Sequence, residues 1–293
     1  MTVVNTNISA LIGLNNLRIT NLGLQKTLER LSSGLRINVG ADDPSGLAIA
    51  KGMEAQVGGL RTAVQNAEDG ISLIHTADGT LSETHDILMR MRDLAVRAAN
   101  EATLTTTDQE KLHNEFKSLR DELSRKAQAV TFNTKTLFTG SAGGFGSGFR
   151  LQIGPDNGAN HIITVMIATM TLTGFGFGSG DGVGADSGFW VSGDDVKQNA
   201  SYALSFIDFI DSAINRVSDT RASLGIQERR LLHIIDDMKA QDINISAAKS
   251  RIIDADMAVE ITEFTRLQIL QQSGTAILAQ ANAQPQSILM LLR

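Results

Sequence analysis

The sequence predicts a mainly α protein, a long antiparallel hairpin of helices that forms a coiled-coil rod, with a small glycine-rich β insert at its tip. Apolar residues recur in alternating steps of three and four in both halves of the chain, and this is the heptad pattern of a coiled coil. Aromatic residues are scarce, with one Trp, one Tyr and eleven Phe in 293 residues, which favours helices packed side by side. Fifteen of the 27 glycines lie between Gly140 and Gly193, where the heptads stop.

The first heptad stripe predicts a helix near the N-terminus that pairs with another helix. Its members are Leu14, Leu17, Asn21, Leu24, Leu28, Leu31 and Leu35. Asn21 is the one polar member, and a single Asn in such a seam commonly fixes the register. The following segment, Ser32–Gly46, contains three glycines, Pro44 and an Asp pair, so we expect a bend or loop there.

A long helical rod is predicted after this linker, because its apolar stripe continues far beyond the mean helix length of about 11 residues. The stripe consists of Met53, Val57, Leu60, Val64, Ala67, Ile71 and Ile74, followed less regularly by Leu81, Leu88, Met91, Ala95 and Ala98. A turn over residues 100–107 then leads to a shorter helix, for which Asp108 is the expected N-cap. Leu112, Phe116, Leu119 and Leu123 give that helix its apolar stripe.

The glycine-rich region is expected to form short β-hairpins, since it contains β-prone runs at residues 149–153 and 161–172. Its glycine-rich stretch at residues 174–186 lacks the Lys-Ser/Thr of a phosphate-binding loop and predicts a surface loop. After Asp194 a second long helix is predicted, with only Arg221 and Glu228 off its heptad pattern. The apolar members are Ile207, Ile210, Ile214, Val217, Leu224, Leu231, Ile235 and Met238.

A weaker stripe predicts a C-terminal helix, with a break at Pro285. Its members are Met257, Ile261, Phe264, Leu267, Leu270, Ile277 and Ala281. The expected organisation is therefore a terminal coiled-coil layer (1–45 and 240–293), a helical rod (46–139 and 194–239) and a short surface-exposed insert (140–193).

Composition excludes several classes of function. The net charge is −6 and no basic stretch is interleaved with aromatic residues, so nucleic acid is not an expected partner. No run of 18 apolar residues and no cleavable secretory signal is present, so we expect neither membrane insertion nor a cleaved leader. The chain has no Cys, and its five His residues show no metal-ligand spacing. We therefore expect no enzyme activity and no cofactor.

The two ends of the chain are the strongest functional signal. Residues 1–17 and 267–292 carry no charged side chain and mix aliphatic residues with Asn, Gln and Ser. Such segments are too polar to span a bilayer and too apolar to remain solvated. They predict self-association into a homopolymer, in which the heptad stripes of both terminal helices form the polymerisation seam.

Six segments of the sequence resemble bacterial flagellin. They are NTNISALIGLNNL, LERLSSGLRIN, ADDPSGLAIA, MRMRDLAVRAAN, SRIIDADMAVE and FTRLQILQQSGTAILAQANAQPQSILMLL. The resemblance covers residues 1–140 and 194–293. It implies a structural subunit of the flagellar filament, with the terminal helices in the inner layers and the insert outside.

The same resemblance implies partners and a location. These are the flagellar type III export apparatus, which would export the chain without cleaving a signal, a cytosolic chaperone at the C-terminal segment, and the flagellar cap and hook–filament junction proteins. Residues 89–96 are similar to the flagellin patch that animal innate immune receptors recognise and that also contacts neighbouring protofilaments. The corresponding residues are Arg90, Leu94 and Glu115.

Three alternatives remain open from the sequence. A cytosolic coiled-coil adaptor would have the heptads but leaves the uncharged ends unexplained, whereas another flagellar axial protein, such as a hook-associated protein, would share both. An enzyme would need converging polar groups between residues 140 and 193.

Overall fold

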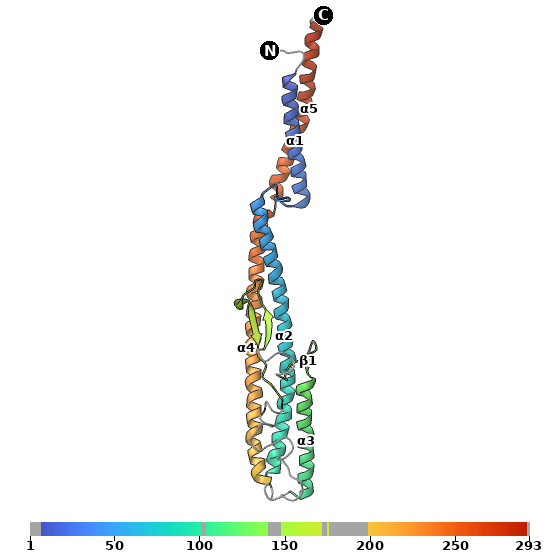
Figure 1. Ribbon diagram of the computed structural model, residues 1–293. Helices are drawn as coiled ribbons and strands as arrows, with labels where there is room; N and C mark the ends of the chain where they lie inside the picture. Colours follow the sequence, from blue (N-terminus) through green and yellow to red (C-terminus); the bar gives the residue numbers. More distant parts are fainter. Residues whose placement is uncertain (1–6, 101–103, 140–147, 172–174, 176–198, 292–293) are drawn as a thin grey trace. The chain divides into compact units, whose positions relative to one another are not determined.

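The computed structural model describes residues 7–100, 104–139, 148–171, 175 and 199–291, and it confirms the mainly α prediction (Figure 1). The helices are α1 (Ile8–Ser33), α2 (Pro44–Ala98), α3 (Thr106–Ala129), α4 (Asn199–Ile253) and α5 (Met257–Leu291). The short elements are β1 (Thr131–Phe132), β2 (Lys135–Thr136), β3 (Phe149–Gln152), the 3-10 helix η1 (Ala159–His161) and β4 (Ile162–Val165). The chain divides into a terminal unit, Met1–Gly58 with Asp242–Arg293, and a central unit, Gly59–Gln241.

Local signals in the sequence set both ends of α1. The side chain of Asn7 accepts a hydrogen bond from the Ala10 N–H at 3.0 Å and so caps the first turn. At the other end Gly34 has a φ of 72°, and its N–H donates to the Arg30 carbonyl at 2.8 Å. Glycine is the residue that adopts this left-handed conformation at no steric cost. The helix therefore ends at Ser33, although the heptad pattern of the sequence continues to Leu35.

The predicted linker lies between α1 and α2, and two aspartates order it. Asp43 accepts from the Gly46 N–H at 2.9 Å and so caps the start of α2, in which Pro44 is the first residue. Asp42 accepts from the N–H groups of Asn38 and Val39 at 3.2 and 3.4 Å.

Lys26 on α1 lies 2.7 Å from Asp42, and its hydrogen bond is the main cause that lowers the pKa of this carboxyl to about 2 from an ordinary value of 3.8. Because the folded-state pKa lies below the ordinary value, the carboxylate stabilises the linker at pH values above 3.8. This contribution is lost as the pH falls towards 2. An NMR titration should give a midpoint near 2 for Asp42, and amide protection of Val39 should fall with it. A midpoint at the ordinary value would contradict the Lys26 contact, and Asp42→Ala, which removes the acceptor oxygens, should lose the protection at every pH.

In the central unit α2 and α4 run antiparallel, side by side (Figure 1). Arg221 of α4 pairs with Asp78 of α2, and Arg92 of α2 pairs with Asp211 of α4. Most of the predicted stripe residues of α2 and α4 are buried, either between these two helices or under α3 and the β3–β4 hairpin. Buried members include Leu60, Ala67, Ile74, Leu81, Leu88, Met91, Ile210, Val217, Leu224, Leu231, Ile235 and Met238.

At two predicted stripe positions of α2 the preceding residue is the more deeply buried one. Val64 and Ile71 are only half-buried, whereas their neighbours Ala63 and Gly70 are buried. The spacing of three and four residues is kept, but the buried positions in this part of α2 hold small residues, Ala63, Ala67 and Gly70. Leu151 explains this at Gly70, because a Cβ on that glycine would lie 2.3 Å from Leu151 Cδ1. The missing side chain is what allows β3 to approach the helix.

Helix α3 begins at Thr106 and lies beside α2 (Figure 1). Its N-cap is Thr105 and not Asp108 as predicted. The Thr105 hydroxyl accepts from the Asp108 N–H at 3.3 Å and lies 2.6 Å from the Asp108 carboxylate, so Asp108 belongs to the cap as its third helical residue. The Thr105 hydroxyl, together with Lys111, lowers the pKa of Asp108, and this negative charge stabilises the helix N-terminus.

The predicted hairpin is present, because β3 and β4 pair antiparallel with Phe149 opposite Val165. Its expected place at the tip of the rod is wrong for the described residues. Asn66 of α2 donates to the Gln152 carbonyl at 3.0 Å, and Gln227 of α4 accepts from the Met166 N–H at 3.2 Å. The hairpin therefore lies along the two helices, where the small residues of α2 leave room for it.

Gly59 of α2 supports the loop after β3 in the same way. A Cβ on Gly59 would lie 2.6 Å from Pro155 Cβ and 3.0 Å from its Cα, which is backbone and cannot rotate away. We expect Gly59→Ala to displace residues 153–158 from α2 and to increase their proteolysis. A Cβ on the neighbouring Gly58 would meet no atom within 4 Å, so Gly58→Ala should instead stabilise the helix by about 1 kcal/mol. Equal behaviour of the two variants would show that the loop does not rest on α2.

The predicted break at Pro285 is also wrong, since α5 continues through it to Leu291. Proline removes one backbone donor but holds φ near −65°, a helical value. The fixed φ is compatible with a continuing helix, although a proline in a helix interior costs one hydrogen bond and crowds the preceding turn.

Candidate functional site

The α1–α5 pair of the terminal unit is the candidate functional site, because it contains both predicted seams. The two helices lie side by side and antiparallel (Figure 1). Leucines of each helix cover glycines of the other: a Cβ on Gly13 would lie 3.4 Å from Leu278 Cδ1, and one on Gly274 would lie 3.2 Å from Leu17 Cδ1. Leu267 covers Gly23 in the same manner. The small residues let the helices approach closely.

Polar contacts fix the register of this pair. Asn21 Oδ1 accepts from Gln271 Nε2 at 2.9 Å, so the Asn predicted to set the register has an amide partner across the seam. Arg30 Nη1 lies 3.1 Å from Glu260 Oε1, and the Glu260 side chain is 11% exposed. Near the chain ends Asn7 Nδ2 donates to the Ala281 carbonyl at 2.7 Å. A one-turn slip would leave these partly buried groups unpaired, which is costly.

The structure places the predicted seam residues in two groups. Those turned towards the partner helix are buried or half-buried: Leu17, Asn21, Leu24, Leu31, Leu35, Phe264 and Leu267. The others are exposed: Leu14, Leu28, Met257, Ile261, Leu270 and Ile277. Each predicted seam is thus divided: some of its residues form the α1–α5 contact, and the others lie on a surface that α1 and α5 leave uncovered.

The sequence reasoning missed a further set of apolar residues on the uncovered side. On α1 these are Ile8, Leu11, Ile12, Ile19 and Leu22, and on α5 they are Val259 and Ile269. The α1 members are 55–61% exposed and lie on the side of the helix away from α5, because their spacing of three, four and seven keeps them on one face. We call these residues, with the exposed seam residues above, the outer apolar face, meaning all of these exposed apolar side chains of the pair. The five α1 residues share one side of that helix, whereas Leu14 and Leu28 belong to its seam stripe. A second stripe at positions 8, 12 and 19 was the signal that could have revealed it.

Charges on α5 oppose packing on this face only weakly. Arg266 donates to Glu263 on the same helix, with Nε 2.8 Å from Oε2. The hydrogen bond from Arg266 lowers the pKa of Glu263 and raises that of Arg266. The pair is therefore neutral as a unit, and no second molecule is needed to balance it.

The second predicted site lies on α2 and α3. Arg90 donates through Nε to Glu115 Oε1 at 2.9 Å, and both side chains are about half exposed, at 55% and 43%. Leu94, by contrast, is 3% exposed and belongs to the core. The structure therefore brings Arg90 and Glu115 together at the surface, and it does not offer the Leu94 side chain to a partner.

The described residues include no group of three or more His, Asp or Glu placed to hold a metal ion. Among the helices of the described segments, none has a stretch apolar and long enough to cross a bilayer. The predicted loop at residues 174–186 lies outside the described residues, apart from Phe175.

Comparisons with known proteins identify the family. Residues 4–143 match the bacterial flagellin N-terminal helical region, and residues 207–292 match the bacterial flagellin C-terminal helical region. The chain is 40% identical to a flagellin from Halalkalibacterium halodurans, over 99% of this chain and 100% of the relative. It is 42% identical to a flagellin from Bacillus subtilis, over 99% of each chain.

A solved structure, described as a flagellar hook-associated protein from Vibrio parahaemolyticus, shares the fold alone. It is 13% identical, covers 73% of this chain and 100% of its own, and has a TM-score of 0.57. The two family matches together span more than half of the chain, and the flagellin relatives cover nearly all of it, whereas none of these findings favours an adaptor or a hook-associated protein. The chain therefore belongs to the bacterial flagellin family.

Proposed function

We propose that this chain, a structural subunit of the bacterial flagellar filament and not an enzyme, polymerises by burying the outer apolar face of its α1–α5 pair against sister subunits. One observation carries this proposal: α1 is apolar on two faces, and α5 covers only one of them. A helix that is apolar all round belongs in a buried environment. Each of the exposed Leu and Ile side chains would contribute about 1 kcal/mol when it is covered.

The proposal extends to the layers of the filament, which lies outside the cell. We place residues 1–45 and 240–293 in its inner core, residues 46–139 and 194–239 in the rod around it, and residues 140–193 on the outer surface. The division of the chain at Asp242 supports the boundary near residue 240, whereas on the N-terminal side the division falls after Gly58, within α2.

The partners that act before assembly follow from the same surface. Ile269, Leu270 and Ile277 are 58%, 43% and 63% exposed on α5, and an apolar patch of this kind would aggregate in the cytosol if it were left uncovered. We therefore propose a cytosolic chaperone that covers the C-terminal segment before assembly. From the flagellin family of the chain we further propose export by the flagellar type III apparatus without a cleaved signal, and contacts with the cap and hook–filament junction proteins. An animal innate immune receptor would meet Arg90 and Glu115, which are exposed, and not Leu94.

The test is assembly of the purified full chain. Dilute protein should be monomeric, with terminal residues that exchange their amides and are cut by proteases. After addition of short filament seeds, electron microscopy should show open helical tubes, and both ends should become protected. A small closed oligomer, or terminal protection already complete in the dilute monomer, would overturn the proposal.

A further inference from the structure

The α2–α4 pair is interrupted by charge in its middle. Along α4 the seam residues Val217, Leu224 and Leu231 are each fully buried. Arg221 and Glu228 occupy the two heptad positions between them. A seam that alternates buried leucine with charged side chains is held together less tightly there than in its apolar parts.

Arg221 and Glu228 each have a partner on α2, but both pairs are partly exposed to solvent. Arg221 donates to Asp78 through Nε at 2.7 Å and Nη2 at 3.3 Å, and this hydrogen bond raises the pKa of Arg221. Glu228 Oε1 lies 2.9 Å from His75 Nε2. The Arg221 and Asp78 side chains are 37% and 41% exposed, and ion pairs this open to solvent hold helices together weakly.

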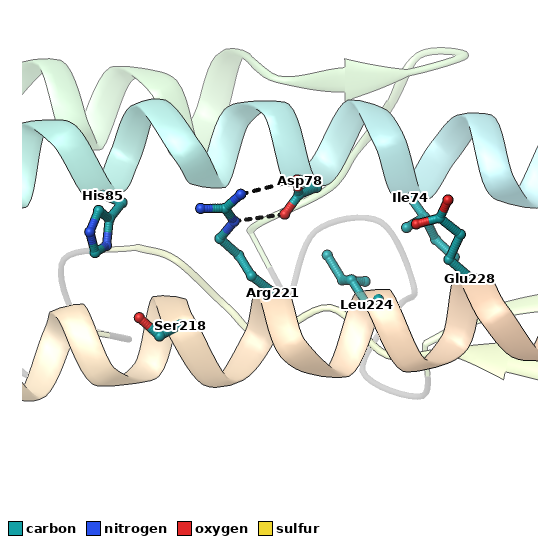
Figure 2. A pocket seen from close by; sticks show the side chains of 8 residues that line it. Ile74, Asp78, His85, Ser218, Arg221, Leu224 and Glu228 are labelled. Atoms are coloured by element: carbon teal, nitrogen blue, oxygen red, sulfur yellow. Dashed lines mark hydrogen bonds and ion pairs between the residues drawn. The ribbon is translucent and has the colours of Figure 1, made fainter.

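A hollow of about 360 Å³ lies between the helices at this level (Figure 2). Its lining includes Ile74, Asp78, His85, Arg221, Leu224 and Glu228. Figure 2 shows Arg221 reaching across from α4 to Asp78, with His85 and Ser218 to one side of the pair. A polar space of this size admits water beside the Asp78–Arg221 pair, while Ile74, Leu81 and Leu224 are fully buried in the seam at the same level.

Two helical glycines lie in the same section, and nothing among the described residues requires them. A Cβ on Gly79 of α2 or on Gly225 of α4 would meet no atom within 4 Å. Gly59 and Gly70 differ, because the hairpin and its loop fill the space that they leave. Glycine in a helix interior lowers local helix stability by about 1 kcal/mol relative to alanine. Both helices are therefore intrinsically weak at one level of the pair.

We propose that residues 74–85 of α2 and 218–228 of α4 form a built-in opening section, in which the two helices separate locally while the flanking seams stay paired. The Asp78–Arg221 and His75–Glu228 pairs close this section, and the two glycines let it open. The section gives the rod one place where α2 and α4 shift against each other. It goes beyond assembly through the terminal helices, since all of its residues lie in the central unit.

Hydrogen exchange of the full-length monomer, read as protection factors at single residues, tests the proposal. Amides of residues 74–85 and 218–228 should be less protected than those of residues 88–95 and 231–238. Gly79→Ala and Gly225→Ala should each raise protection in the section about fivefold, which is the helix-propensity difference expressed as an equilibrium ratio. The double variant Asp78→Leu/Arg221→Leu should also raise it, because a leucine at position 221 continues the apolar seam of α4 and the ion pair that is lost is partly exposed and weak.

Gly52→Ala is the matched control. Gly52 also lies in α2, and a Cβ added there would meet no atom within 4 Å, so this variant adds the same helix propensity outside the section. It should leave protection at residues 74–85 unchanged. The proposal is overturned if the section is as well protected as its flanks, or if Gly52→Ala raises its protection as much as Gly79→Ala does. Either result leaves polymerisation through α1 and α5 unaffected, so the two proposals fail separately.

Discussion

Replacement of Ile12 and Ile19 by glutamate should abolish filament formation. Both side chains are exposed in the single chain, at 57% and 56%, and lie on the outer apolar face of α1. The substitutions therefore remove no contact with α5, and the monomer should keep its helical circular dichroism. In the polymer each carboxylate would enter an apolar contact without a partner, at a cost of several kcal/mol.

Sedimentation of seeded polymer measures the effect as a critical concentration. A loss of about 4 kcal/mol per subunit raises that concentration about a thousandfold, which is beyond the range in which tubes form. Ile12→Met/Ile19→Met is the control, since methionine retains most of the apolar volume and should polymerise nearly as the unaltered chain does. Normal assembly of the glutamate variant would mean that this face stays in contact with water in the filament.

The helices themselves could be predicted from the sequence because apolar periodicity and local signals mark them, although the cap of α3 and the passage of α5 through Pro285 differ from the prediction. Gly34 ends α1 through a positive φ, and Asp43 with Pro44 starts α2. The heptads of α2 and α4 are long enough to predict the pairing of distant segments. These signals depend on residues that are neighbours along the chain, so no knowledge of the rest of the fold is needed.

Two of the errors arose where a contact with another element decides burial. At Gly70 the hydrophobic pattern favoured Ile71, but Leu151 of the hairpin packs against the position that has no side chain. The placement of the hairpin along α2 could not be predicted for the same reason, since a glycine in a helix indicates space without indicating what fills it. The error at Asp108 has a local cause and involves no other element. Thr105 and Asp108 are both good capping residues, three positions apart, and Thr105 is the cap.

The candidate site was predicted in part. The stripes through Leu17 and Leu267 were interpreted as seams between subunits, whereas in the single chain both residues pack inside the α1–α5 pair. The uncharged ends pointed to additional cover, which stays a prediction. A heptad search selects one stripe per helix, however, whereas α1 has two. Its second stripe, through Ile12 and Ile19, became evident only when α5 was seen to cover the other side.

Leu231→Ala should cause a large loss of stability in the central unit. Leu231 is fully buried in the seam of α4, at 0% exposure, and replacement of a buried leucine by alanine costs about 2–5 kcal/mol through lost apolar contact and the cavity that remains. The free energy of unfolding, measured by urea titration of the dilute monomer with circular dichroism, should fall by this amount.

The adjacent Leu232 is the matched control, because it is 47% exposed and belongs to the same helix turn. Leu232→Ala makes the same chemical change without leaving a cavity, so we expect a loss of less than about 1 kcal/mol. If the two variants lose equal stability, α4 does not pack on α2 through the heptad face that contains Leu224 and Leu231. If only Leu231→Ala is destabilised, this face holds the central unit together. The ion pairs of the opening section then contribute specificity of register rather than most of the stability.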